Sequence, residues 1–210
     1  MTLRCLVLAS GRGSNFEALL RASAGADAPY ALTGLVTDRP ATGAQALAEA
    51  AGVPQRCLPF KAFPSRASFD QALAETLVTA APDLVLCAGF MRVLGPAFFT
   101  HCPLPLVNIH PALLPAHRGL HTHRRVLEAG DPFHGATVHW LTPALDSGPT
   151  IAQARLPVLP GEGEAALAAR VLRLEHALYP QALAHLAAHR LAPPTPLELF
   201  WDEEALTPWA

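Results

Sequence analysis

Short apolar runs that alternate with helical patterns constrain the fold of this chain more than any other feature. Residues 3–9 and 83–88 are almost continuously apolar, as expected of strands that are buried on both faces. Segments with apolar residues at helical spacing, such as 68–80, lie between runs of this kind. Strands that alternate with helices predict an α/β fold, a doubly wound and mostly parallel sheet with flanking helices.

The pattern changes in the second half of the chain. Before Asn108 we expect strands at 3–9, 30–37, 53–58 and 83–88, and helices at 16–22, 42–51, 68–80 and from about Pro96. After Asn108, residues 136–141 and 150–158 predict two strands around a short loop, as an antiparallel pair. Residues 164–179 predict a long helix that continues or kinks over 180–190.

The length of 210 residues fits one large domain or two small ones, and we expect a single domain. We expect a phosphate-binding half at 1–100, a catalytic half at 101–192 and a proline-rich tail at 193–210 that lies over the surface. Hydrophobic residues make up 51% of the chain, which provides for a sizeable core.

Charge and cysteine content exclude several classes of function. The net charge is −2, Lys61 is the single lysine, and no basic block occurs, which argues against nucleic acid or an anionic membrane as partner. The four cysteines show neither C-x-x-C nor zinc-ligand spacing, so a reduced, cytoplasmic setting without a metal is expected. No signal peptide or membrane span is predicted, and a monomer or a homodimer is expected.

An apolar run at 104–109 ends in a polar pair. Strand alternation directs the side chains of Asn108 and His110 to the same side, where a buried strand opens into a loop at Pro111. Ligands bind at such strand ends in open α/β sheets. An amide that donates to a carbonyl oxygen and an imidazole that moves a proton suit acyl chemistry, although such a pair also simply closes off strands.

A glycine loop at 10–15 joins the first strand to the first helix. Backbone N–H groups at a helix start bind anions, and Ser14 and Asn15 add side-chain donors or cap the helix. The dinucleotide fingerprint needs a third glycine where Phe16 stands, and the Walker Lys is absent. A phosphate monoester therefore fits the loop better, if the turn binds a ligand at all.

Two further segments offer chemistry. Residues 89–95 follow a buried strand, and their apolar side chains with Arg92 would line a pocket for a flat heterocycle, or merely connect a strand to a helix. Asp146 lies in the Asp-Ser-Gly turn between the two late strands, and it would orient and charge His110 if the two meet.

Glu175 borders the apolar face of the long helix, where a glutamate is ordinarily a solvated edge residue.

Six histidines crowd positions 110–139, without His-Glu-x-x-His or any Cys/His spacing. We therefore expect polar loop residues or neighbours of a substrate site at His121 and His123, not metal ligands.

These motifs occur together, and in order, in one known family. The chain resembles the phosphoribosylglycinamide formyltransferases, folate-dependent enzymes of purine synthesis with a Rossmann-like fold, over roughly residues 3–190. The matching segments are SGRGSN at 10–15, AGFMRVL at 88–94, NIHPALLP at 108–115, GLHTH at 119–123, TVH at 137–139, LDSGP at 145–149 and EHALYP at 175–180.

The resemblance implies roles for residues at the matching positions. Gly13, Ser14 and Asn15 would hold the 5′-phosphate of glycinamide ribonucleotide, and Glu175 its ribose hydroxyls. The folate would contact Arg66, Met91, Arg92, Val93, Leu94, Asn108, Leu145 and Asp146, and the catalytic residues would be Asn108, His110 and Asp146. The segment 116–118 is less uniform in the family and receives no role beyond a loop near the site.

The implied reaction is transfer of the formyl group of 10-formyltetrahydrofolate, as co-substrate, to the glycinamide amine without a metal. Asn108 and protonated His110 would stabilise the oxyanion, while Asp146 handles protons. Formyltetrahydrofolate deformylase shares the Asn/His/Asp set but lacks the phosphate loop, and methionyl-tRNA formyltransferase needs a further domain and a basic surface. A non-catalytic nucleotide-binding protein on the same fold is the third alternative.

Overall fold

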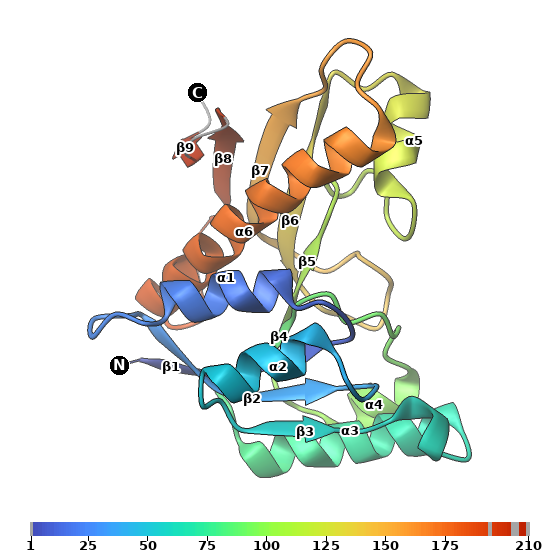
Figure 1. Ribbon diagram of the computed structural model, residues 1–210, viewed down its shortest axis with the longest axis vertical. Helices are drawn as coiled ribbons and strands as arrows, with labels where there is room; N and C mark the ends of the chain where they lie inside the picture. The colour runs from blue at the N-terminus through green and yellow to red at the C-terminus, as the bar shows by residue number, and fades with distance from the viewer. Residues whose placement is uncertain (1, 193–194, 203–205, 209–210) are drawn as a thin grey trace. The chain divides into compact units, whose positions relative to one another are not determined.

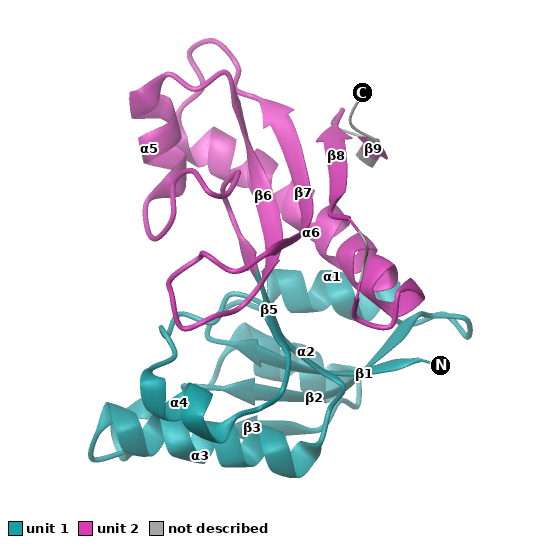
Figure 2. Cartoon of the chain, turned by 180° about the vertical axis from the view of Figure 1, so that it is seen from behind, with its two compact units in different colours: residues 1–108 teal, residues 109–210 magenta. Residues whose placement is uncertain are grey.

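In the first compact unit, the strand that comes first in the chain lies in the middle of the strand order, and later strands lie first on one side of it and then on the other. The computed structural model describes residues 2–192, 195–202 and 206–208, and it separates into units at 1–108 and 109–210 (Figure 2). In the first unit the parallel order is β3-β2-β1-β4-β5. These strands are β1 (Leu3–Ala9), β2 (Tyr30–Thr37), β3 (Gln55–Cys57), β4 (Leu84–Cys87) and β5 (Leu106–His110).

Helices connect these strands in the doubly wound manner. They are α1 (Ser14–Ala22), α2 (Gly43–Ala50), α3 (Arg66–Ala80) and α4 (Pro96–His101), with a 3-10 turn η1 (Phe60–Ala62) (Figure 1). Because parallel crossovers are right-handed, α1 and α2 lie on one face of the sheet and α3 and α4 on the other. The carboxyl ends of β1 and β4 thus form a topological switch point, where α/β sheets bind ligands.

Local sequence signals set the helix starts in this unit. Thr42 and Gln45 form a capping box at α2, Ser65 caps α3 in the same way with Ser68, and Pro96 occupies the first turn of α4. The side chains of β1 from Cys5 to Ala9 are buried, in keeping with a central strand covered on both faces.

The second unit holds a mixed set of strands and the longest helix. β6 (Phe133–Trp140) and β7 (Thr150–Pro157) are antiparallel, β8 (Leu197–Trp201) runs parallel to β7, and β9 (Leu206–Pro208) is antiparallel to β8. Helix α6 (Glu164–Ala188) packs on β6 and β7, and α5 (Thr122–Ala129) precedes β6. Pro180 lies inside α6 without ending it, so the helix continues through 180–188.

The predicted α/β fold with a mostly parallel sheet and an antiparallel pair is confirmed. Three elements of the second unit, α5, β8 and β9, were not predicted. Helix α5 buries only Thr122 and Val126, so its apolar pattern is too sparse to stand out. Leu199 and Trp201 are buried on β8, a period-two signal that the flanking prolines obscured. The expected surface tail is therefore partly strand, and positions 193–194, 203–205 and 209–210 of that tail lie outside the described residues.

The two units divide between Asn108 and Ile109, inside β5, whereas the sequence placed the division of the halves at 100–101. Among the described helices, none is both long and apolar enough to cross a membrane.

The loop from β1 to α1 depends on one glycine. Gly13 has φ +85°, and a Cβ there would lie 2.7 Å from the Cα of Ala44 in α2. Both the left-handed backbone and the contact with α2 exclude a larger residue. Gly11 in the same loop has open space at its Cβ position.

We therefore expect Gly13→Ala to lower the free energy of unfolding by about 2 kcal/mol or more, because strain and steric overlap add. Gly11→Ala is the matched control and should be nearly neutral. Urea unfolding of both variants and the wild type measures this, and equal stabilities of the two variants would contradict the expectation.

Candidate active site

Strand β5 presents Asn108 and His110 as the sequence predicted. Side chains alternate along the strand, so the two lie on the same side with buried Ile109 between them. Asn108 is half-buried and His110 is 6% exposed. The strand ends at His110 because Pro111, which follows, has no N–H to continue the ladder.

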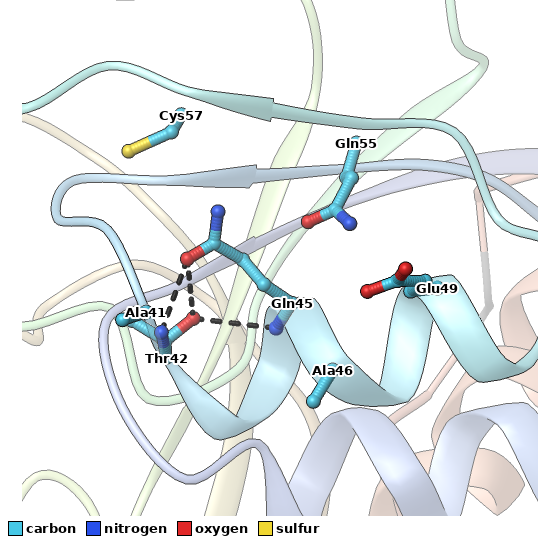
Figure 3. Close-up of a pocket in the computed structure, with 7 residues that line it drawn as sticks. All are labelled: Ala41, Thr42, Gln45, Ala46, Glu49, Gln55 and Cys57. Atoms are coloured by element: carbon cyan, nitrogen blue, oxygen red, sulfur yellow. Dashed lines mark hydrogen bonds between the residues drawn. The ribbon is translucent and has the colours of Figure 1, made fainter.

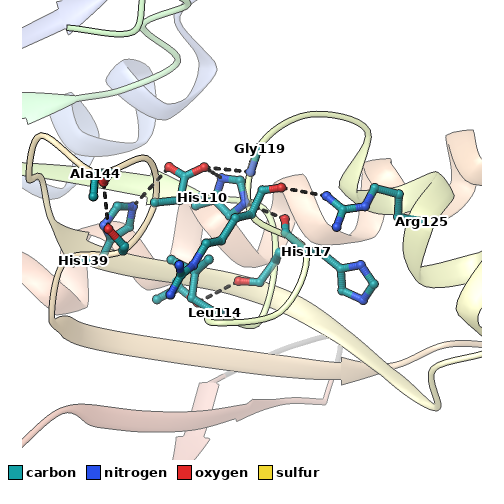
Figure 4. Close-up of polar contacts among 12 residues, drawn as sticks. His110, Leu114, His117, Gly119, Arg125, His139 and Ala144 are labelled. Atoms are coloured by element: carbon teal, nitrogen blue, oxygen red, sulfur yellow. Dashed lines mark hydrogen bonds and ion pairs between the residues drawn. The ribbon is translucent and has the colours of Figure 1, made fainter. Parts of the chain in front are cut away.

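In the second unit, His110 lies beside Asp146 and a backbone carbonyl (Figure 4). Its Nδ1 is 3.5 Å from Oδ2 of Asp146, and its Nε2 donates to the carbonyl oxygen of His117 at 3.1 Å. Both neighbours are hydrogen-bond acceptors. Each ring nitrogen of His110 therefore faces an acceptor. The predicted meeting of His110 and Asp146 therefore occurs, with both side chains largely buried.

Asp146 is held by its turn and by a backbone donor. Its Oδ2 accepts a hydrogen bond from the N–H of Gly119 at 2.9 Å, and its own φ is +44°, a conformation that Asp tolerates better than most residues. Ser147 donates to the carbonyl of Ala144, closing the turn. Gly148 follows, and a Cβ there would lie 1.8 Å from the carbonyl oxygen of Trp140, which leaves no room for another side chain.

His139 on β6 is the second imidazole near Asp146. Its Nε2 lies 3.8 Å from Oδ1 of Asp146, and its Nδ1 donates to the carbonyl of Trp140 at 3.0 Å. Burial lowers the pKa of His139, and the hydrogen bond to Trp140 and the charge of Asp146 oppose this only in part. His139 is thus a neutral neighbour of the carboxylate.

Sequence analysis expected polar loop residues or neighbours of a substrate site at His121 and His123. Exposed His121 lies in the loop just before α5, whereas His123 does not lie in a loop. His123 lies on α5 and its Nδ1 is 3.0 Å from Nε2 of His134 on β6, while His121 is the left-handed N-cap of α5. Burial lowers the pKa of both His123 and His134, that of His134 to about 3. His123 is therefore not a loop residue, and one ring of the pair donates to the other. Within the described chain, no group of three potential metal-binding side chains occurs.

The loop after β5 is fixed by Thr137 on β6. Its hydroxyl donates to the carbonyl of Ala112 at 2.7 Å and accepts from the N–H of Leu114 and the amide of Gln153. These bonds hold the backbone that leads away from His110.

In the first unit, the glycine loop lies against the segment after β4. The N–H of Ser10 donates to the carbonyl of Gly89, and the hydroxyl of Ser10 accepts from the N–H of Met91. Gly13 is the N-cap of α1, and it has no side chain with which to cap that helix. Ser14 and Asn15 occupy the first turn, where backbone N–H groups lack intrahelical acceptors. The loop is thus suited to an anion.

The segment 89–95 presents apolar side chains and a restrained arginine. Met91 and Val93 are exposed by 67% and 59%, whereas Leu94 is buried. Arg92 donates to the buried carboxylate of Asp38 at 2.7 Å and lies over the ring of Phe60. Arg92 therefore stabilises the backbone of this segment, a role that sequence analysis did not foresee.

Arg66 also contacts the segment 89–95. Its guanidinium donates to the carbonyl of Val93, and its Nε lies 3.7 Å from Oδ2 of Asp70. The same carboxylate oxygen of Asp70 accepts from the N–H of Gly95. Burial raises the pKa of Asp70, against the opposing effects of Gly95 and Arg66.

The remaining predicted residues lie in the second unit. Leu145 precedes Asp146 and is 53% exposed. Glu175 on α6 is 7% exposed, so it is a buried polar residue and not a solvated edge residue. Burial of a glutamate indicates a specific structural or binding role.

A shallow depression of about 560 Å³ lies elsewhere in the first unit, between α2 and β3 (Figure 3). Thr42 and Gln45 line it and hydrogen-bond each other in the capping box of α2. None of the predicted site residues lines this depression.

Sequence reasoning missed His117, His139 and Asp38. The Thr137-Val138-His139 alternation on a predicted strand was an available signal for His139. His117 and Asp38 act through contacts with residues distant in the sequence, for which no local pattern exists.

The buried histidines predict a stability that depends on pH. Folded His134 stays neutral down to about pH 3, whereas in the unfolded chain histidine binds a proton near pH 6.5. The unfolded state thus binds more protons between these values, and the free energy of unfolding falls as the pH drops through this window, by at most about 1.4 kcal/mol per pH unit from this residue.

We expect His134→Gln to reduce this slope, measured by urea unfolding at pH 7.0, 6.0 and 5.0. Val138→Ala, which removes buried methyl groups on the same strand without a titratable group, should lower stability but keep the wild-type slope. Equal slopes in wild type and His134→Gln would contradict the assignment.

Comparison with known proteins agrees with this architecture and with the motifs. Residues 3–183 match the formyl transferase family. The chain is 41% identical to phosphoribosylglycinamide formyltransferase of Escherichia coli, over 90% of this chain and 89% of that protein. It is 42% identical to the trifunctional purine biosynthetic protein adenosine-3 of Drosophila pseudoobscura, over 90% of this chain but only 14% of that longer protein.

Solved structures give the same result. The phosphoribosylglycinamide formyltransferase of Coxiella burnetii superimposes with a TM-score of 0.84 at 39% identity, over 90% of this chain and 89% of that one. The chain therefore belongs to the formyl transferase family and, within it, to the phosphoribosylglycinamide formyltransferases.

Proposed function

We propose that this protein transfers the formyl group of 10-formyltetrahydrofolate to the amine of glycinamide ribonucleotide in de novo purine biosynthesis. The observation that carries this is the buried contact of His110 with Asp146. His110 lies two positions after Asn108 on β5. Relatives named for this reaction cover most of the chain. We further propose that the chain works as a single formyltransferase domain in the cytoplasm.

The ribonucleotide would be held by phosphate and ribose contacts. The amides of the first turn of α1, with Ser14 and Asn15, would bind the 5′-phosphate, because the N-cap residue Gly13 has no side chain to accept from them. Gly13 lets the backbone turn at this point. Glu175 would bind ribose hydroxyls, which supplies a reason for a glutamate on the buried face of α6.

The folate would cover apolar side chains that are otherwise exposed. Met91 and Val93 in the first unit and Leu145 in the second are all more than half exposed, which is unfavourable for large apolar residues without a ligand. The backbone of 91–94 would bind the pterin ring, with Leu94 supporting it from the core. Arg92 and Arg66 would act by fixing this backbone through Asp38 and the carbonyl of Val93.

The chemistry would proceed by direct attack. The glycinamide nitrogen attacks the formyl carbon and forms a tetrahedral intermediate with negative charge on the formyl oxygen. The amide of Asn108 would donate to this oxygen, and so would the Nδ1–H of the His110 imidazolium, which is 3.5 Å from Asp146 while Nε2 is bonded to the carbonyl of His117. One such donor contributes about 3 kcal/mol. Asp146 would keep His110 charged and accept the amine proton, directly or through water. The same proton would then pass to the tetrahydrofolate nitrogen as its bond to the formyl carbon breaks and tetrahydrofolate leaves.

A formyl-transfer assay tests the proposal. Purified protein would be incubated with 10-formyltetrahydrofolate, with and without glycinamide ribonucleotide, while tetrahydrofolate release and the mass of the ribonucleotide are followed. We expect release only with acceptor, together with a formyl mass gain. Release without acceptor would instead identify a deformylase, and no release a binding protein or another donor.

Asp146→Asn should lower kcat by two or more orders of magnitude while the fold persists. Asn tolerates the same left-handed backbone and can still accept from Gly119, but it carries no charge and accepts a proton poorly. Steady-state kinetics measure this, with the exposed Asp27→Asn as control. A kcat near the wild-type value would remove Asp146 from the catalytic set.

Ser14→Ala combined with Asn15→Ala should raise KM for the ribonucleotide about tenfold and change KM for the folate little. The two side chains add donors to the proposed phosphate site, and each lost charge-assisted hydrogen bond weakens binding. Ser23→Ala at the other end of α1 is the control. A selective rise of KM for the folate would refute the phosphate assignment.

A further inference from the structure

Three consecutive residues of one loop contact the groups around His110. The carbonyl of His117 accepts from Nε2 of His110 at 3.1 Å, and the N–H of Gly119 donates to Oδ2 of Asp146 at 2.9 Å (Figure 4). The carbonyl of Arg118 between them accepts from Nη1 of Arg125 on α5 at 2.7 Å. The backbone of 117–119 therefore sets where His110 and Asp146 lie relative to each other.

The side chain of His117 fastens this backbone. Its Nε2 lies 2.6 Å from Oδ2 of Asp131, and the ring is 15% exposed. Among the described residues, its buried Nδ1 has no hydrogen-bond partner, so the proton belongs on Nε2, which donates to the carboxylate. A hydrogen bond this short to a charged oxygen is among the stronger ones in proteins.

Asp131 is itself held by the end of α5. Gly130 ends that helix in the left-handed conformation, and the N–H of Asp131 donates to the carbonyl of buried Val126. The carboxylate is thus attached to a rigid element. His117 in turn has φ +52°, which is unfavourable for a residue with a side chain and persists only where contacts enforce it.

We propose that His117 and Asp131 are a positioning pair for the proposed formyl transfer. Their hydrogen bond holds the 117–119 backbone, which keeps the ring of His110 and the carboxylate of Asp146 in their reactive arrangement. Neither residue touches the reacting atoms. The inference rests on the proposed function for its effect on turnover, whereas its structural consequence, the orientation of His110, does not depend on that function.

Asp131→Ala tests the pair. Small displacements of reacting groups lower rates strongly, so we expect kcat to fall about tenfold or more, with KM for both substrates within about twofold. Asp131→Asn should retain most of the activity, because its amide oxygen accepts the same hydrogen bond. The matched control is Glu164→Ala, which removes another carboxylate bound to α5, through Arg124, without affecting the 117–119 backbone.

His117→Gly provides a second route to the same test. Glycine adopts the left-handed conformation freely, so the loop folds without strain but loses its attachment to Asp131. We expect a fall in kcat similar to that of Asp131→Ala. Retention of kcat within twofold in both variants, with an active wild type, would overturn the inference.

The ¹⁵N chemical shifts of the histidine rings provide a readout apart from activity. The Nε2 signal of His110 should move in Asp131→Ala and His117→Gly and stay in place in Glu164→Ala. An unchanged signal would overturn the inference even if kcat falls. A wild type without transfer activity would refute the proposed function alone, and the signal of His110 would then decide on the positioning pair by itself.

Discussion

Burial of the Asp146 carboxylate is the constraint on which the arrangement of the second unit depends. A carboxylate out of water needs polar partners close by, and here the N–H of Gly119 donates to it while Nδ1 of His110 lies 3.5 Å away. Two backbone segments must therefore be fixed. The turn at 144–148 positions the carboxylate, and the segment 117–119 positions the N–H that donates to it. The strained φ values of His117 and Asp146 lie at these two points, where the surrounding contacts stabilise them.

The histidines near Asp146 and along β6 are of two kinds. His134 and His139 are deeply buried and His123 largely so, and burial lowers the pKa of all three, so they remain neutral and serve as hydrogen-bonding packing residues. His110 instead has an acceptor at each ring nitrogen. The same residue type thus performs different tasks a few residues apart, and the difference lies in the acceptors that surround each ring.

In the first unit, the change in strand order between β1 and β4 determines which loops lie side by side. It brings the glycine loop and the 89–95 segment together at the carboxyl ends of adjacent strands, where Ser10 bonds to Gly89 and Met91. Two buried acids, Asp38 and Asp70, then hold the second segment through Arg92 and Gly95. Exposed apolar side chains of Met91 and Val93 remain on this fixed backbone for a ligand to cover.

The strands of the first unit, the glycine loop and the pair Asn108 and His110 were all predictable from the sequence, because periodicity, glycine positions and strand alternation are local properties. Helix α5 and strand β8 were not predicted from the sequence, because their local patterns are weak and tertiary contacts stabilise them. Three side-chain contacts became evident in the folded structure alone: Asp146 with His110, Asp38 with Arg92, and Asp131 with His117. These contacts join residues far apart in the chain, and their energies arise from burial and hydrogen bonding, which exist only once the chain has folded.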